Sequence, residues 1–407
     1  MKQIPGGITA PKGFRAWGVH CGVKSKKADK KDLTLILSDQ ECAAAAVYTM
    51  NRVKAAPLYV TMEHLEDGTA WGVAANSGNA NACCPMSHEY AEEMARLAAR
   101  ATGRAPADFV VASTGVIGQT LNIAAIRAGM PEAAAGLTAG PEGSDAAARA
   151  IMTTDTVKKE LALACSIGGR TVTLGAIAKG SGMIHPNMGT MLCFVTTDCA
   201  ITREMLAEAL HEVVPRTFNR VTVDGDTSTN DMCAVLANGM AGNALIEWKD
   251  DGYTVFLKAL RQLCQELARA IAGDGEGASR LITCAVREAR SEESAERLAK
   301  AVVGSPLVKA AMFGADANWG RVLCAMGYSK APFRPEYVDI SFSSAVGAVA
   351  VCRGGMGLDF DEEAARSILS QDEVVIDVHL HEGEHEATCW GCDLTYEYVK
   401  INGDYRT

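Results

Sequence analysis

A glycine-rich turn that leads into an apolar strand constrains the fold of this chain more than any other segment. The turn reads Lys179-Gly-Ser-Gly-Met-Ile-His-Pro-Asn-Met-Gly-Thr190, in which the glycines permit close backbone approach and Pro186 fixes the local direction of the chain. The next residues, Met191-Leu-Cys-Phe-Val-Thr-Thr197, have the apolar character of a buried strand. The sequence therefore predicts that Thr190 is held at the start of a core strand.

Thr190 is a candidate nucleophile. A threonine hydroxyl attacks poorly until a base removes its proton, and an N-terminal threonine can use its own α-amine, whose ordinary pKa is about 7.7–8.0. Because Thr190 is internal, the bond after Gly189 would have to be cut first, and a glycine leaves that carbonyl uncrowded. From local chemistry alone, a threonine that merely caps a loop-to-strand junction is the simpler interpretation.

The same segment resembles the self-cleaving site of the ornithine acetyltransferase family, also called glutamate N-acetyltransferases or bifunctional arginine-biosynthesis acetyltransferases. Thr190 matches the threonine that is both cleavage site and nucleophile in that family, and Gly189 replaces its usual alanine, with an effect on the cleavage rate that stays open. Eight further segments resemble the family in order: Gly6-Gly-Ile-Thr-Ala-Pro-Lys-Gly-Phe-Arg15, Asn76-Ser-Gly-Asn-Ala-Asn-Ala-Cys83, Ser113-Thr-Gly-Val-Ile-Gly118, Thr153-Thr-Asp-Thr156, Asp224-Gly-Asp-Thr-Ser-Thr-Asn-Asp231, Gly273-Asp-Gly-Glu-Gly-Ala278, Asn318-Trp-Gly-Arg321 and Lys400-Ile-Asn-Gly-Asp-Tyr-Arg-Thr407.

The resemblance implies an α/β (α+β) fold, a DmpA/ornithine-acetyltransferase-like sandwich of β-sheets with flanking helices. It also implies cleavage between Gly189 and Thr190, in which Thr190 Oγ attacks the Gly189 carbonyl and water hydrolyses the resulting ester. The products would be an α fragment, 1–189, and a β fragment, 190–407, which stay interwoven and assemble as an α2β2 heterotetramer.

The resemblance also assigns roles to individual residues. Thr114 and Gly115 match the pair that forms the oxyanion hole, and a hydroxyl and a backbone N–H are suitable donors. Taken alone, this segment would more often be a strand-ending turn. The positions that match substrate-binding residues are Thr153, Lys179, Thr190, Glu276, Asn402 and Thr407.

Glu276 and the C-terminal tail are expected to hold the substrate's variable end. The glycines of Gly273-Asp-Gly-Glu-Gly277 should end a helix over 254–272 and turn Glu276 outward, where its carboxylate would pair with the side-chain ammonium of ornithine. Asn402 and Thr407 would close the pocket from a tail that composition alone predicts to be frayed.

The predicted activity is transfer of acetyl from N2-acetylornithine to glutamate through an acetyl ester of Thr190, a step of the cyclic arginine pathway. The resemblance implies no cofactor, and whether acetyl-CoA is a second donor stays open. Two other classes remain as alternatives. Water could attack the same ester, as in an N-terminal-nucleophile amidase or aminopeptidase, or cleavage could merely mature a non-enzymatic assembly protein.

Composition limits the remaining classes. The chain has 407 residues, 48% of them hydrophobic and 22% charged, as is usual for globular proteins. Its net charge of −10 argues against nucleic-acid binding, which needs a basic face. The N-terminus lacks the pattern of a signal or transit peptide, and no segment approaches the ~18 apolar residues of a membrane helix, so we expect a cytoplasmic protein.

Fourteen cysteines raise the question of disulfides or metal. Without a secretion signal, most are expected to be reduced core residues. His379, His381 and His385 precede Cys389 and Cys392, and these side chains could bind zinc, but the histidines alternate in a strand-and-turn pattern. The resemblance implies no metal there, and the question stays open.

Strand-like and helical patterns alternate along the chain, as expected for α/β or α+β folds. Strands are predicted at 33–37, 45–48, 109–112, 172–177, 191–197, 338–342, 348–352 and 374–379, and helices at 90–101, 123–137, 203–213, 254–272 and 291–302. The acidic loop at 224–231 lacks the spacing of an EF-hand, so we interpret it as structural or close to the substrate, and the role of Asn318-Trp-Gly-Arg321 stays open.

Overall fold

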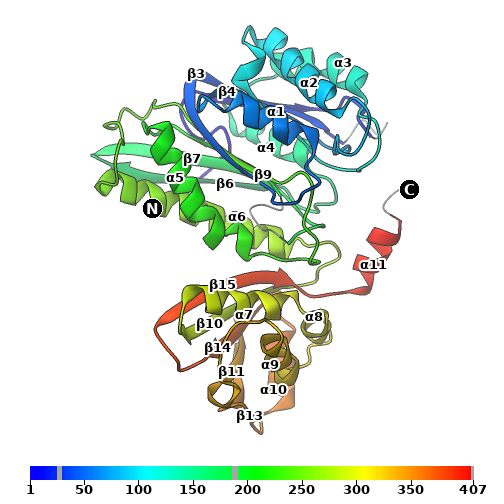
Figure 1. Cartoon of the computed structure of the whole chain (residues 1–407), viewed down its shortest axis with the longest axis vertical. Helices are drawn as coiled ribbons and strands as arrows, with labels where there is room; N and C mark the ends of the chain where they lie inside the picture. The colour runs from blue at the N-terminus through cyan, green and yellow to red at the C-terminus, as the bar shows by residue number, and fades with distance from the viewer. Residues whose placement is uncertain (25–29, 186–190, 405–407) are drawn as a thin grey trace. The chain divides into compact units, whose positions relative to one another are not determined.

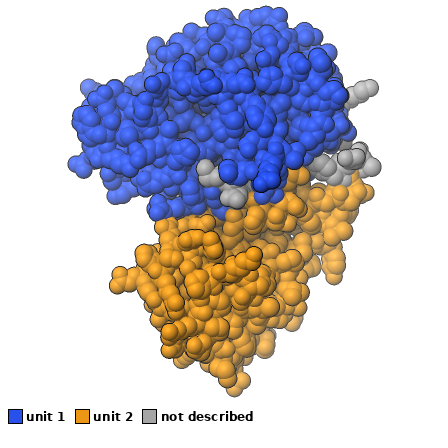
Figure 2. All heavy atoms as spheres, viewed as in Figure 1, with its two compact units in different colours: residues 1–180, 186–219, 227–267 blue, residues 181–185, 220–226, 268–407 orange. Residues whose placement is uncertain are grey.

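The chain folds into two compact units (Figure 2). The computed structural model describes residues 1–24, 30–185 and 191–404. Unit 1 spans Met1–Gly180, Pro186–Asn219 and Thr227–Leu267, and unit 2 spans Ser181–His185, Arg220–Asp226 and Ala268–Thr407. Each unit therefore combines residues from both sides of the bond between residues 189 and 190.

Unit 1 is built on one mixed sheet. In the described part of the chain its strands are β1 (Lys2–Ile4), β2 (Phe14–Val19), β3 (Leu33–Tyr48), β4 (Thr69–Asn76), β5 (Phe109–Ser113), β6 (Lys159–Ile167), β7 (Arg170–Lys179), β8 (Leu192–Thr197) and β9 (Met232–Ala237). Their order is β1-β6-β7-β8-β9-β3-β4-β5, and β2 also pairs with β3.

The long strand β3 joins two halves of this sheet. Its first half pairs with β2 and its second half with β9, while β4 pairs with both parts across a register shift between Leu37 and Cys42. The strands predicted at 33–37 and 45–48 are therefore the two ends of one strand. The irregularity lets β3 belong to both halves, because a bulge bends and twists its strand.

Helices cover unit 1. They are α1 (Ala56–His64), α2 (Ser87–Thr102), α3 (Ile123–Ala135), α4 (Pro141–Ile151), α5 (Arg203–Val213) and α6 (Asp251–Gly273), of which α6 continues into unit 2 after Leu267. In Figure 1, α2 and α3 lie on the opposite side of unit 1 from α5 and α6.

Side-chain alternation along the strands separates two cores in unit 1. Leu33, Leu35 and Leu37 of β3 pack in a cluster with α2 and α3, whereas Ile36 faces a second cluster that includes Phe194 of β8 and residues of β4, β5, β7, β9 and α4. Because successive strand residues point to opposite faces, one strand supplies both clusters. The second cluster takes residues from both halves of the sheet, which therefore share one core.

Unit 2 contains a second sheet, covered by helices. The described strands are β10 (Leu281–Ala289), β11 (Asp339–Ser344), β12 (Gly347–Arg353), β13 (Met356–Gly357), β14 (Glu373–His379) and β15 (His385–Cys392), in the order β13-β12-β11-β14-β10-β15. The described helices that belong wholly to unit 2 are α7 (Glu292–Gly304), α8 (Pro306–Phe313), α9 (Trp319–Gly327), α10 (Glu362–Leu369) and α11 (Tyr396–Gly403). Val374, Ile376 and Val378 of β14 are buried in one cluster with residues of α7 to α10.

The α/β prediction is confirmed. Apart from the two predicted strands that form the single strand β3, the predicted helices and strands are also confirmed to within a few residues at each end. The strand expected from residue 191 begins at Leu192, and the helix expected over 203–213 has those bounds. Through the described ranges, no helix has the length and apolar character needed to cross a membrane.

Candidate active site

The two residues predicted to form the oxyanion hole, Thr114 and Gly115, lie in the loop after β5 in unit 1. Gly115 has a φ of +132°, and a Cβ added to it would lie 2.4 Å from the Gly78 carbonyl carbon and 2.5 Å from the Asn79 nitrogen, so the position requires glycine. The Thr114 N–H donates to the Asn76 carbonyl at 3.0 Å, whereas no described residue accepts from the Gly115 N–H. A backbone donor without an acceptor is what an oxyanion hole needs.

Lys179 lies next to this loop. It is the last residue of β7, it is only 7% exposed, and its Nζ donates to the Thr114 Oγ at 3.5 Å. The backbone of Lys179 is the register partner of Leu192, the first residue of β8. A predicted substrate residue, a predicted oxyanion residue and the strand that follows residue 190 in sequence therefore meet in unit 1.

Thr153 is tied to the same group of residues through Asp155. The Thr153 N–H donates to Asp155 Oδ2 at 3.0 Å, and the Gly180 N–H donates to Asp155 Oδ1 at 2.7 Å. Burial alone would raise the pKa of the Asp155 carboxyl, but the nearby ammonium groups of Lys179 and Lys159 outweigh it and hold that pKa below its usual value.

Glu276 and Asn402 meet in unit 2. Asn402 Nδ2 donates to Glu276 Oε2 at 2.8 Å, and Glu276 is 6% exposed. The expectation that the glycine-rich turn points Glu276 outward is therefore wrong. The Glu276 backbone N–H donates to the Ser181 carbonyl at 3.0 Å, and this contact with a segment far away in sequence turns the side chain inward.

Glycines make room for this arrangement. A Cβ on Gly182 would lie 2.3 Å from the Glu276 carboxyl carbon, and a Cβ on Gly277 would lie 2.6 Å from the Tyr398 nitrogen. The tail is helical through α11, and Thr395 caps that helix by accepting from the Glu397 N–H at 3.2 Å. Within the described residues the tail is therefore ordered, not frayed.

The acidic loop at 224–231 is structural in its described contacts. Asp224 accepts hydrogen bonds from the Met183 N–H at 2.6 Å and the Ile184 N–H at 2.9 Å, and Tyr398 donates to it at 3.4 Å. In unit 1, Asn230 Nδ2 donates to the Ser113 carbonyl at 2.8 Å, next to the oxyanion loop. These contacts agree with a structural role for the loop, and the Asn230 contact also places it beside the predicted oxyanion residues.

Three predicted site residues, Gly189, Thr190 and Thr407, lie outside the described residues. The others form two sets. Thr114, Gly115, Thr153 and Lys179 belong to unit 1, whereas Glu276 and Asn402 belong to unit 2.

Asp155 and Asp224 lie in the motifs at 153–156 and 224–231, but the sequence predicts no individual role for either residue. In the sequence, each of these aspartates stands among hydroxyl residues and glycines. That pattern does not reveal which backbone N–H groups donate to the carboxylate.

Of the residues considered for zinc, His381 lies between two carboxylates and both cysteines are buried. His381 Nδ1 lies 2.8 Å from Glu288 Oε2 and its Nε2 lies 3.0 Å from Asp339 Oδ2, while Cys389 and Cys392 are buried. Over the ranges that the structure covers, no group of three or more His, Cys, Asp or Glu side chains is placed to hold a metal ion.

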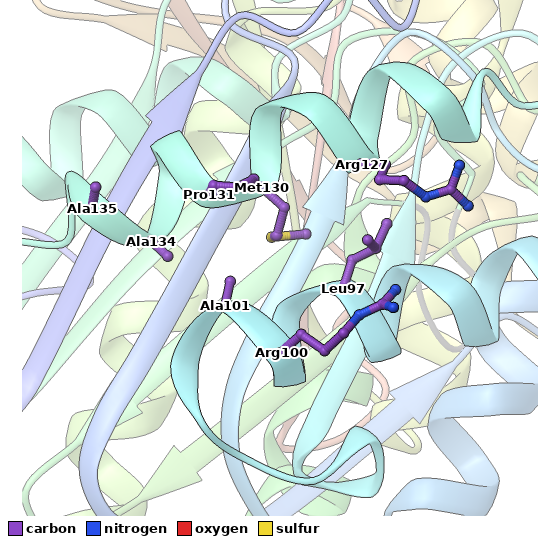
Figure 3. A pocket seen from close by; sticks show the side chains of 8 residues that line it. All are labelled: Leu97, Arg100, Ala101, Arg127, Met130, Pro131, Ala134 and Ala135. Atoms are coloured by element: carbon purple, nitrogen blue, oxygen red, sulfur yellow. The ribbon is translucent and has the colours of Figure 1, made fainter.

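A pocket of about 580 Å³ lies between α2 and α3 of unit 1 (Figure 3). Leu97, Met130 and small residues line it, and Arg100 and Arg127 lie toward one end, where both donate to Glu93. None of the predicted site residues lines this pocket.

Comparison with known proteins places the chain in a family. The model of the ArgJ family matches residues 15–407. The arginine biosynthesis bifunctional protein ArgJ of Symbiobacterium thermophilum is 54% identical over 100% of both chains, and ArgJ 1 of Clostridium acetobutylicum is 49% identical over 97% of this chain and 96% of its own. The crystal structure of the Bacillus halodurans arginine biosynthesis bifunctional protein argJ is 45% identical, covers 52% of this chain and 97% of its own, and has a TM-score of 0.50. The chain belongs to the ArgJ family.

Proposed function

We propose that this ArgJ-family chain, an acetyltransferase of arginine biosynthesis, moves the acetyl group of N2-acetylornithine to glutamate through an ester on Thr190. One observation carries the proposal. The buried ammonium of Lys179 lies 3.5 Å from the Thr114 hydroxyl, and Lys179 pairs with Leu192, which follows Thr190 by two residues in sequence. A cation, an oxyanion donor and a nucleophile are the groups that acyl transfer between amino acids requires.

The nucleophile is proposed to form by self-cleavage. Thr190 Oγ attacks the Gly189 carbonyl carbon, the peptide C–N bond breaks, and the α-amine leaves with a proton. Water then hydrolyses the ester, which gives a carboxylate on Gly189 and an N-terminal Thr190 with fragments 1–189 and 190–407. Because both compact units contain residues of both fragments, we expect them to stay associated.

Acetyl transfer would then proceed in two steps. Thr190 Oγ attacks the acetyl carbonyl carbon of acetylornithine, and the α-amine of Thr190 takes the hydroxyl proton. The amide C–N bond then breaks, and ornithine leaves with its nitrogen protonated. The amine of glutamate next attacks the ester carbonyl carbon, a new C–N bond forms as the C–O bond to Thr190 Oγ breaks, and the proton lost by the amine returns to Thr190 Oγ. The Gly115 N–H and the Thr114 hydroxyl would stabilise the oxyanion of each step, with Lys179 supplying positive charge for a carboxylate.

Glu276 and Asn402 are proposed to recognise the substrate's other end. Glu276 carries a carboxylate that can pair with the side-chain ammonium of ornithine, and Asn402 already donates to it. Thr153 and Thr407 complete the proposed substrate set. Small amino acids are thus the expected substrates, and none of these steps uses a resident cofactor.

Three further features belong to the proposal. Acetyl-CoA is expected to serve as a second acetyl donor, because the relatives carry the name bifunctional. An α2β2 assembly is expected from the family resemblance. A cytoplasmic location is supported by the cysteines, since all fourteen are free thiols, as is usual in reducing compartments.

The decisive experiment incubates the purified protein with N2-acetylornithine and glutamate and identifies the products by mass spectrometry. Acetylglutamate and ornithine are expected. Free acetate without acetylglutamate would indicate an amidase, and no reaction at all would leave a self-cleaving assembly protein. Replacing acetylornithine with acetyl-CoA in the same assay tests the second donor.

A further inference from the structure

A buried serine in unit 2 holds the turn that carries Glu276. Ser181 is fully buried, and its Oγ donates to the Asp274 carbonyl at 2.7 Å. The Ser181 carbonyl accepts from the Glu276 N–H at 3.0 Å. Ser181 therefore bonds to the backbone on both sides of Gly275 and fixes the start of the Glu276 side chain.

Two further hydrogen bonds hold the ends of this turn. The Asp274 N–H donates to the Ala270 carbonyl at 3.2 Å, where α6 ends, and Thr395 Oγ1 donates to the Gly277 carbonyl at 2.6 Å. These bonds fix where the turn begins and ends. The two bonds from Ser181 then determine how Glu276 is oriented between those ends.

The glycine after Ser181 leaves the space that the Glu276 carboxylate occupies. A Cβ added to Gly182 would lie 2.3 Å from the Glu276 carboxyl carbon, 2.3 Å from its Oε2 and 2.5 Å from its Oε1, and these are the three nearest atoms. Asn402 Nδ2 donates to the same Oε2 at 2.8 Å. A larger residue at position 182 would therefore displace the carboxylate before it met any other group.

We propose that Ser181 and Gly182 are positioning residues for Glu276, and that they set the preference for a substrate with a side-chain ammonium. Ser181 fixes the Glu276 backbone, and Gly182 leaves the carboxylate where it can accept from that ammonium. The inference rests on the proposed function, in which Glu276 pairs with ornithine. If the chain is cut after residue 189, Ser181 and Gly182 lie in one fragment and Glu276 lies in the other, so both fragments set the preference.

The test measures calorimetric binding of ornithine and of norvaline, which has the same carbon chain without the side-chain ammonium. The wild-type protein is expected to bind ornithine at least about tenfold more tightly than norvaline, the size of one charge-assisted hydrogen bond.

Two variants should lose this preference. Ser181→Ala leaves the turn bonded to residue 181 by one hydrogen bond instead of two, and Gly182→Ala displaces the carboxylate. In each variant the preference should fall to about threefold or less, while the Kd of norvaline should stay within about twofold of wild type. A merely structural role would weaken both ligands alike and keep their ratio.

Thr217→Val is the matched control. Thr217 is also fully buried, and its Oγ1 donates to the Val213 carbonyl at 2.9 Å where α5 ends, but it is not one of the proposed site residues. This variant should lose thermal stability to a similar extent as Ser181→Ala and keep the wild-type preference for ornithine.

An unchanged preference in either variant, or a wild-type protein that binds both ligands equally, would overturn the inference. If Ser181→Ala does not fold, Gly182→Ala decides, because the Gly182 φ lies outside the left-handed region and the new Cβ meets only the movable end of a side chain. The acetyl-transfer assay on the wild-type protein is read separately. Failure to form acetylglutamate refutes the proposed function, whereas acetylglutamate formation with an unchanged preference in the variants refutes only this inference.

Discussion

Substituting Gly115 with alanine tests whether its backbone N–H is the oxyanion donor. The Gly115 φ of +132° is one that L side chains rarely adopt, and the new Cβ would lie 2.4 and 2.5 Å from backbone atoms of Gly78 and Asn79. Ordinary carbon contacts lie near 3.5–4.0 Å, so the loop has to move by about 1 Å. Backbone atoms cannot rotate away as a flexible side chain can.

Two energetic costs set the expected loss of stability in the Gly115→Ala variant. Backbone strain at such a φ costs about 1–3 kcal/mol, and forcing a methyl group into a packed site costs about 1–3 kcal/mol more. We therefore expect the free energy of unfolding to fall by about 2–6 kcal/mol. Because the shifted loop carries the Gly115 N–H, kcat should fall by about 10²–10³, the usual effect of losing one oxyanion donor.

The assay follows acetylglutamate formation at saturating acetylornithine and glutamate, alongside thermal unfolding of the same preparations. Gly118→Ala is the matched control, because Gly118 lies in the same loop with a φ of +77° and no atom lies within 4 Å of its added Cβ. This control should lose some stability but keep its kcat. A Gly115→Ala enzyme with kcat within about threefold of wild type would refute the assignment.

Four further predictions concern cleavage, the tail and pH. Thr190→Ala should leave the chain full length in mass analysis and inactive, because it removes the only hydroxyl proposed for both steps; an active, uncut variant contradicts the mechanism. Asp224→Ala should slow the appearance of the two fragments in a time course, since two backbone amides upstream of the cleavage site lose their acceptor. Deleting residues 404–407 should abolish acetyl transfer but not cleavage, which needs no amino-acid substrate, and full transfer activity would remove the tail from the site. Burial, and then the charge of Lys300, lower the pKa of His185 to about 4, so its neutral form is favoured in the folded state. Stability should therefore be fully present above about pH 6.5 and fall as the pH drops toward 4, and His185→Gln should flatten that decline in thermal unfolding.

The sequence by itself determined the local elements and the family. Periodicity placed the helix Arg203–Val213 and the strand Leu192–Thr197 because those patterns describe which face of each element is apolar, and that is a local property. The run of motifs around Thr190 indicated the reaction to expect, since the residue types alone fix which functional groups are present.

Only the tertiary structure decided which of these residues meet and how they are charged. Two predicted strands proved to be one, β3, because its pairing with both halves of the sheet overrides the polar interruption at residues 39–41. Glu276 is buried against Asn402, 126 residues away, and Asp155 accepts from the Gly180 N–H, 25 residues away. Burial and hydrogen-bond partners across such separations depend on how the chain crosses between strands, and no local pattern of residues contains that information.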